Sequence, residues 1–275
     1  MHQGQTIQDN IHHGVESRSH PLLAILLLIF ALISPSGCLV SRGQRYDHFT
    51  TWTPLPKGAA LILGIMGGRE PWNNDQRDVR RLALKLREIA PESLHVETVE
   101  NKKRQLAVEL IRNCLDRNQD HSLSRSERRS IHLILYGQSF GGAAVLKLAR
   151  QLRALDVPVL LTVQVDSVGR DDSLIPENVA FAANLFQKND FFIRGEPEIR
   201  ASDPSHTMIL GNYEFDYRDK PIDLSGVSWF KKVFRTAHTK MGHDPAVWDK
   251  VEALIWETLR GAGIDPLERS SPTPL

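Results

Sequence analysis

An apolar run that leads directly into a Gly-x-Ser-x-Gly motif constrains this chain more than any other stretch. Residues 131–135 have the apolar composition of a short strand buried on both faces, and Gly137 and Gly141 flank Ser139. The two glycines carry no Cβ, so the chain can turn sharply from this strand into a following helix without collision. We expect the turn to lift the Ser139 hydroxyl above the carboxyl edge of a sheet. It would also aim the Phe140 N–H at an oxyanion formed beside that hydroxyl.

The motif has an apolar strand before it and a Gly- and Ala-rich helix after it. In this context it resembles the nucleophile elbow of the α/β-hydrolase superfamily, through the residues Gly137-Gln138-Ser139-Phe140-Gly141. The resemblance covers roughly residues 59–259. It implies an acyl-enzyme formed on the serine, and a nucleophile, an acid and a histidine in that order along the chain. The competing interpretation is a glycine-rich turn of another α/β protein in which the serine only caps the helix.

The sequence around the motif alternates apolar strands with amphipathic helices. This alternation predicts an α/β fold with a mostly parallel central sheet and helices on both faces, as in the α/β-hydrolase fold. We expect one such domain over 58–261, with residues 170–229 either capping the pocket or forming a decorated loop insertion. The expected strands are 59–63, 94–99, 131–136, 157–165 and 179–186, and the expected helices are 75–89, 101–115, 141–150 and 245–259.

The resemblance also indicates which residues would complete a catalytic triad. Asp166 follows an apolar strand at its carboxyl end, where the triad acid belongs in this superfamily, and Asp190 after the next strand is the alternative. The triad histidine belongs in the loop before the last helix. His238 fits it through a His-x-x-Met pattern with Met241, and His243 is the alternative.

The loop after the first strand is expected to supply a second oxyanion donor. Met66-Gly67-Gly68 is similar to that loop in many superfamily members, although Gly64-Ile65 stands where those relatives carry His-Gly. We therefore predict that the Met66 N–H and the amide after the serine hold the oxyanion. No redox or organic cofactor is required by this chemistry.

The segment from Asp116 to Glu127 resembles the calcium loop of an EF-hand. His121 occupies the position where such loops carry glycine, and that position requires a positive φ. The loop enters the nucleophile strand from its amino end, so an ion there would stabilise the fold and take no part in the chemistry. The alternative is a solvated polar loop. The expected oxygen ligands are Asp116, Asn118, Asp120, Ser122 and Glu127.

The N-terminal residues have the character of an export signal. A continuous apolar run over 22–33 has the length of a signal-peptide core, and Ser36-Gly37-Cys38 resembles the end of a bacterial lipobox, although Pro35 departs from it. We predict a signal peptide or N-terminal membrane anchor over 1–38, a linker over 39–57 and a disordered tail over 262–275. The protein would then reside in the cell envelope, anchored in the membrane or lipidated at Cys38, or be secreted.

The charge balance gives no electrostatic case for nucleic-acid binding, because Lys and Arg together number 34 and Asp and Glu 33. The resemblance implies a serine hydrolase of the carboxylesterase or lipase kind that cleaves a small-molecule carboxylic ester or a lipid ester. The alternatives are a thioesterase of the same fold and a non-catalytic exported binding protein built on that fold. A calcium-responsive adaptor centred on the EF-hand-like loop is a third interpretation.

Overall fold

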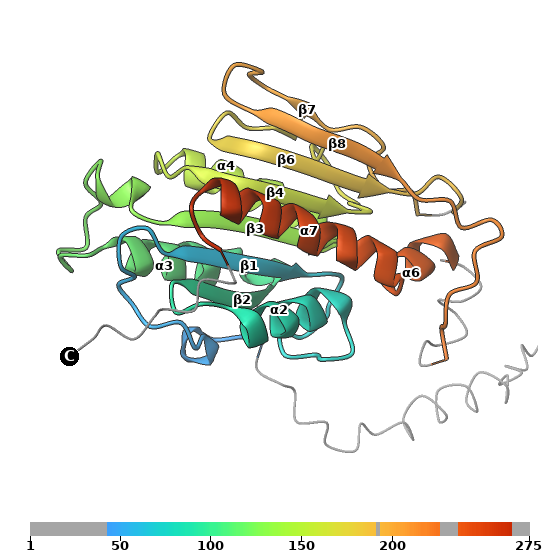
Figure 1. Ribbon diagram of the computed structural model, residues 1–275, viewed down its shortest axis with the longest axis horizontal. Coiled ribbons are helices and arrows are strands. Elements are labelled where there is room, and N and C mark those ends of the chain that lie inside the picture. The colour runs from blue at the N-terminus through green and yellow to red at the C-terminus, as the bar shows by residue number, and fades with distance from the viewer. Residues whose placement is uncertain (1–42, 191–192, 226–235, 266–275) are drawn as a thin grey trace, which may run out of the picture. The chain divides into compact units, whose positions relative to one another are not determined.

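A six-stranded, entirely parallel sheet organises residues 43–190, 193–225 and 236–265, which are the residues that the computed structural model describes (Figure 1). Its strands are β1 (Ala60–Met66), β2 (Leu94–Glu100), β3 (His132–Gln138), β4 (Val159–Val165), β6 (Val179–Phe186) and β8 (Met208–Glu214). They lie in the order β2-β1-β3-β4-β6-β8. The predicted α/β fold with a mostly parallel sheet is confirmed.

Helices cover both faces of the sheet. They are α2 (Asp78–Ile89), α3 (Arg104–Leu115), α4 (Phe140–Arg153), α6 (Thr236–Gly242) and α7 (Pro245–Gly261). There are also short 3₁₀ turns, η1 (Tyr46–His48) before β1, η2 (Asn101–Lys103) before α3 and η3 (Glu127–Arg129) before β3. The strand β5 (Leu174–Ile175) pairs with β7 (Arg200–Ala201) in a separate small sheet. In Figure 1, α2 and α7 lie over one face of the main sheet, while α3 and α4 lie behind it.

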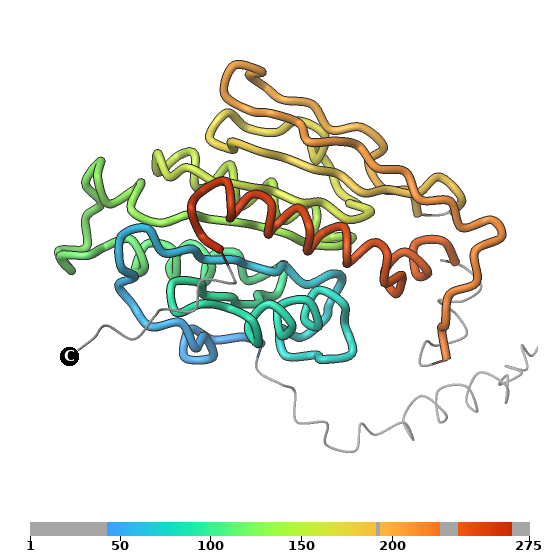
Figure 2. Tube along the Cα trace, in the orientation of Figure 1, coloured from blue at the N-terminus to red at the C-terminus, as the bar shows by residue number. Residues whose placement is uncertain are grey.

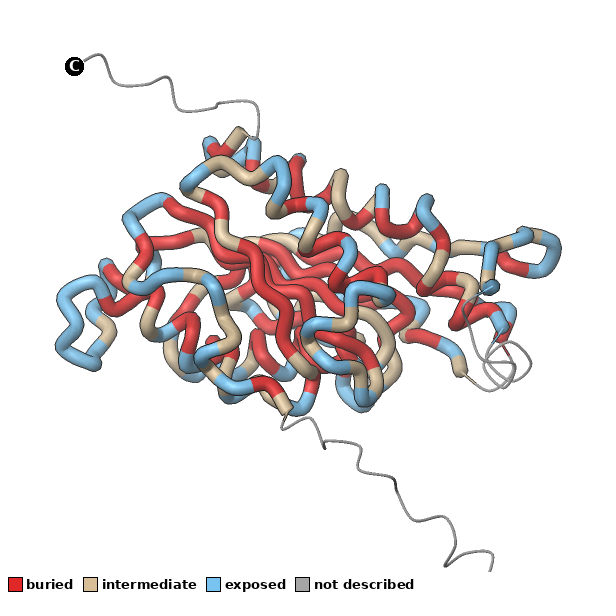
Figure 3. The backbone as a smooth tube through the Cα atoms, turned by 90° about the horizontal axis from the view of Figure 1, so that it is seen from below, coloured by how far each residue is buried: buried red, intermediate tan, exposed pale blue. Residues whose placement is uncertain are grey.

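The alternation of side chains along β1 explains why its whole sequence is apolar. Leu61, Leu63 and Ile65 pack with residues of α3 and α4, whereas Ala60 and Ile62 pack with residues of α2 and α7. Successive side chains of a strand point to opposite faces, so a strand covered on both faces needs apolar residues at every position. Figure 3 shows the resulting band of buried residues along the central strands.

The outer edge of β2 is covered by the segment that precedes β1. Glu97 of β2, whose side chain is 1% exposed, accepts hydrogen bonds from the backbone N–H and hydroxyl groups of Thr50 and Thr51 through one oxygen. Its other oxygen lies 2.8 Å from the Arg87 guanidinium. Within the range predicted as a linker, the part that the structure describes is therefore bound to the sheet.

The range predicted as a cap or insertion, 170–229, contributes β6 and β8 to the main sheet, and the chain trace shows how they extend it beyond β4 (Figure 2). The predicted export signal at 1–38, with Cys38, lies outside the described residues. So does most of the predicted tail, from residue 266 onward. None of the described helices combines the length and the apolar character needed to cross a membrane.

Candidate active site

Ser139 lies in the sharp turn between β3 and α4. Its backbone has φ 57° and ψ −126°, a region that residues with a side chain rarely adopt. Two hydrogen bonds hold this backbone: the Ser139 N–H donates to the Val165 carbonyl at 2.9 Å, and the Val168 N–H donates to the Ser139 carbonyl at 3.1 Å. The serine is thereby fixed at the carboxyl end of the central strands.

The glycines on either side of Ser139 allow this turn because backbone atoms crowd both of them. A Cβ on Gly137 would lie 2.6 Å from the Gly141 carbonyl carbon and 2.9 Å from the Ile65 carbonyl oxygen. A Cβ on Gly141 would meet the carbonyl oxygens of Ile65 and Met66 at the end of β1. The close approach of β1, β3 and the start of α4 is therefore the structural reason for glycine at both positions.

Asp166 and His238 form a buried pair at the same edge of the sheet. The His238 Nδ1 lies 2.6 Å from the Asp166 Oδ2, and the exposed fractions of the two side chains are 11% and 0%. The Gln187 Nε2 donates to the same carboxylate oxygen at 3.1 Å, and the Gly195 N–H donates to the other oxygen at 3.0 Å. Two assigned donors and the His238 ring thus surround the carboxylate. Nε2 is the ring nitrogen of His238 that makes no contact with Asp166. Gln187 and Gly195 were not anticipated from the sequence, although Gln187 directly follows a predicted strand.

The alternative residues occupy different positions in the structure. Asp190 accepts a hydrogen bond from the His238 backbone N–H at 3.4 Å. His243 lies against another carboxylate, with its Nδ1 3.3 Å from the Asp78 Oδ2. The structure therefore places the Asp166 carboxylate against the His238 imidazole. Of the two candidate histidines, it joins His238 to that acid.

His238 belongs to the short helix α6, whereas the sequence predicted a loop at this point. The Lys240 Nζ holds the helix by donating to the carbonyl oxygens of Tyr217 at 3.2 Å and Lys220 at 2.9 Å. At the end of α6, the Gln138 side chain occupies the space where Gly242 would carry a Cβ. This contact brings α6 directly against the residue that precedes the serine.

Ser139 and His238 line one cavity of about 400 Å³, a size suited to a small ligand. In the described part of the chain, no hydrogen bond joins the serine hydroxyl to the histidine ring, and such catalytic contacts often tighten only when substrate is bound. The remaining lining residues are Gly67, Gly68, Arg69, Glu70, Arg77, Asp78, Gln138, Phe140, Val168, Ile193, Thr239, Gly242 and His243.

The two predicted oxyanion donors differ in their relation to this cavity. Phe140 lines it and is the first residue of α4, where the amides of a helix have no intrahelical partner. Met66 is fully buried as the last residue of β1, and the cavity is lined instead by the next two residues, Gly67 and Gly68. A Cβ built on Gly67 would lie 3.7 Å from the Ser139 Cβ. The loop is therefore adjacent to the serine, and Gly67 and Gly68 line the cavity whereas the predicted donor residue Met66 does not.

The EF-hand-like loop is closed by hydrogen bonds to its own backbone. The Asp116 carboxylate accepts from the Asp120 N–H at 3.2 Å and the His121 N–H at 2.9 Å, and His121 has the positive φ predicted for it, 64°. Glu127 accepts from the Ser124 hydroxyl at 2.6 Å, and this bond, with backbone N–H bonds, lowers the pKa of Glu127. Across the described ranges, no group of three or more His, Cys, Asp or Glu has the arrangement of a metal site. Asn118, Ser122 and backbone carbonyls are further oxygen donors of this loop, so calcium binding stays a prediction.

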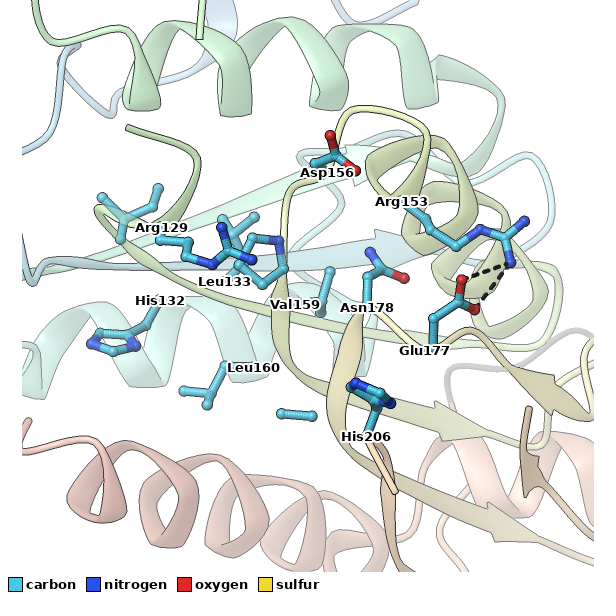
Figure 4. A pocket seen from close by; sticks show the side chains of 13 residues that line it. Arg129, His132, Leu133, Arg153, Asp156, Val159, Leu160, Glu177, Asn178 and His206 are labelled. Carbon is cyan, nitrogen blue, oxygen red and sulfur yellow. Dashed lines mark hydrogen bonds and ion pairs between the residues drawn. The ribbon is translucent and has the colours of Figure 1, made fainter. Parts of the chain in front are cut away.

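A second cavity, of about 530 Å³, lies at the amino ends of β3, β4 and β6 (Figure 4). Its floor is apolar, and its rim carries charged side chains, among them Arg153, whose guanidinium lies 3.1 Å from the Glu177 carboxylate. The Arg129 side chain is exposed at the same rim. No serine or cysteine lines this cavity, and it lies at the opposite end of the strands from Ser139.

No protein family and no curated protein matches the sequence. Among solved structures, the chain is similar to a cutinase-like protein from Cryptococcus sp., with 15% sequence identity and a TM-score of 0.41. The match covers 76% of this chain and 98% of that one.

Proposed function

We propose that this protein is a serine hydrolase that cleaves carboxylic esters through an acyl-enzyme on Ser139. One observation carries the proposal. A serine held in a strained turn at the carboxyl edge of a parallel sheet shares a cavity with His238, whose Nδ1 lies 2.6 Å from the buried Asp166 carboxylate. A nucleophile, a base and a group that orients the base are the parts that acyl transfer requires.

In the proposed mechanism, the Nε2 of His238 takes the proton of the Ser139 hydroxyl as its oxygen attacks the substrate carbonyl. Asp166 keeps the other ring nitrogen, Nδ1, protonated and stabilises the imidazolium that forms. Nε2 then returns the proton to the leaving alcohol, and water repeats the sequence on the acyl-enzyme. Gln187 and Gly195 keep the Asp166 carboxylate in place through their hydrogen bonds.

The tetrahedral intermediate would be held by backbone amides. The Phe140 N–H at the start of α4 is one donor, and the loop Met66-Gly67-Gly68 supplies the other. Support for this loop comes from the position of Gly67 beside the Ser139 Cβ. The chemistry calls on no metal and no organic cofactor, so the residues named suffice for it.

A lipid ester and a thioester remain alternatives within the same mechanism, because they differ from a simple ester in the acyl chain or the leaving group and not in the catalytic groups. Export, with attachment through Cys38 or an N-terminal anchor, is a further proposal and concerns residues outside the described part. It would deliver the enzyme to ester substrates in the cell envelope or beyond it.

The test is hydrolysis of p-nitrophenyl esters of increasing chain length by the full-length protein and by Ser139→Ala, His238→Ala and His243→Ala. We expect Ser139→Ala and His238→Ala to lose kcat on the order of 10⁴-fold or more. His243→Ala should retain a kcat well above both, because its ring contacts Asp78 and not Asp166. A serine-reactive phosphonate should label Ser139 in the wild-type protein.

The second candidate function is a non-catalytic binding protein on this fold. The absence of a hydrogen bond between Ser139 and His238 in the described structure is the observation that favours it. A folded wild-type protein that hydrolyses no ester of the series and is not labelled by the phosphonate would establish this alternative and refute the hydrolase proposal.

A further inference from the structure

The residues that line the cavity containing Ser139 include two chemically different sets. Phe140, Val168 and Ile193 form an apolar wall, and the Phe140 side chain is 54% exposed although it is aromatic. We use the term polar wall for the charged and polar set, which comes from the loop after β1, the start of α2 and the residue after α6. The polar wall consists of Arg69, Glu70, Arg77, Asp78 and His243.

Both carboxylates of the polar wall already have cationic neighbours. The Arg77 Nε lies 3.0 Å from the Glu70 Oε1, and the two side chains are 28% and 22% exposed. The Asp78 carboxylate contacts both the Arg81 guanidinium and His243. Because each carboxylate is matched, the wall has no unpaired negative charge facing the cavity.

Arg69 is the unmatched charge of this wall. Its side chain is exposed and lines the cavity, and no carboxylate of the described residues lies within 4.0 Å of its guanidinium. His243 adds a polar group to this wall. Its Nδ1 contacts Asp78, and Nε2 is the ring nitrogen that makes no contact with that carboxylate. A guanidinium with five donors in a planar fork is well suited to a carboxylate.

We propose that the polar wall binds a carboxylate group of the substrate through Arg69, so that the preferred esters carry a carboxylate near the ester bond. The hydrocarbon part of such a substrate would lie against the apolar wall formed by Phe140, Val168 and Ile193. This inference rests on the proposed hydrolase function and adds its substrate class.

The experiment compares kcat/KM for paired esters that differ in whether one carboxyl group is free, and therefore charged, or esterified. 4-Carboxyphenyl acetate and its methyl ester place the charge on the leaving group, and monoethyl and diethyl adipate place it on the acyl part. We expect the wild-type protein to favour the charged member of at least one pair. Arg69→Gln should reduce that charged-to-neutral ratio by roughly two- to tenfold, the range of a partly exposed charge pair. Using the ratio cancels the intrinsic reactivity difference between the two esters.

Three further measurements separate recognition from a structural role. Arg69→Lys should restore part of the ratio, Arg69→Glu should lower it further, and high salt should reduce the wild-type ratio. Arg129→Gln is the matched control, because Arg129 is also exposed but lines the cavity at the other end of the strands, and it should leave the ratio unchanged.

The outcomes distinguish this inference from the proposed function. If the wild type hydrolyses the neutral esters and Arg69→Gln leaves both ratios unaltered, the carboxylate preference is refuted and the hydrolase proposal stands. If Arg129→Gln lowers the ratio as much as Arg69→Gln does, the effect is one of net charge and the site assignment fails. If the wild type hydrolyses none of the esters and Ser139 resists phosphonate labelling, both proposals fall.

Discussion

Replacing Gly141 by alanine tests whether the contact between β1 and the start of α4 fixes the serine turn. The added Cβ would lie 2.9 Å from the Met66 carbonyl oxygen and 3.0 Å from the Ile65 carbonyl carbon, and closer still to the Ile65 carbonyl oxygen. All three are backbone atoms of the central strand β1, so no side-chain rotation relieves the collision. Either the strand or the helix must move.

The loss of stability expected for Gly141→Ala follows from the rigidity of this backbone. Overpacking a well-packed core costs roughly 1–3 kcal/mol, and the backbone nature of these contacts places Gly141→Ala at or above about 3 kcal/mol. For a chain of this size, that corresponds to a fall in Tm of about 6–12 °C. Gly261→Ala is the matched control, since Gly261 ends α7 with no other heavy atom within 4 Å of its added Cβ. There the same substitution should stabilise the protein by up to about 1 kcal/mol.

The assay is urea unfolding of the two variants and the wild type, followed by circular dichroism, with Tm measured in parallel. The reasoning is refuted if Gly141→Ala unfolds with a free energy within about 1 kcal/mol of the wild-type value. It also fails if the two variants shift stability in the same direction and by a similar amount.

Four other predictions follow from the described contacts. Asp166→Asn should reduce kcat on the order of 10⁴-fold while Asp190→Asn retains far more activity, and the reverse order would assign the acid to Asp190. Burial raises the pKa of the Cys114 thiol to about 12, so iodoacetamide should label Cys114 only in denaturant. The labelling is measured by peptide mass analysis, and labelling of the native protein would contradict the burial of this thiol. Burial lowers the pKa of His132, so below about pH 6.5 the unfolded chain binds a proton that the folded protein does not, and the free energy of unfolding should fall as the pH drops. His132→Gln should flatten this part of the plot of stability against pH, and an unchanged plot would exclude the effect. Calcium should raise the Tm of the wild type and leave that of Glu127→Gln unchanged, and a wild-type Tm unaffected by calcium and by chelator would exclude the site.

The fold could be predicted from the sequence because its signals are local. Strands such as β1 are uninterrupted apolar runs, and the helix expected over 245–259 from its apolar periodicity is observed as α7. The turn at Ser139 was also predictable, since the glycines that it requires are adjacent in sequence. In each case a short stretch carries the physical cause of the structure.

The surroundings of the site were harder to predict because they depend on contacts between distant segments. The helix that carries His238 packs through Gly242 against Gln138, and no local sequence pattern predicts that contact. The same holds for the Gln187 and Gly195 bonds to Asp166 and for the pairing of His243 with Asp78. Sequence patterns supplied the candidate residues, and only tertiary packing decides between Asp166 and Asp190 as the partner of the imidazole.

The order of the strands also bears on how this chain reaches its native state. β1, which is synthesised first, lies between β2 and β3, and its partner in β3 begins only at His132. Forming that pairing requires closing a long loop before any of its hydrogen bonds is gained, which makes folding slow. During synthesis, the edge of β1 that pairs with β3 stays unpaired until β3 has emerged, even after β2 has joined the other edge. Refolding from denaturant should therefore compete with aggregation and improve as the protein concentration is lowered.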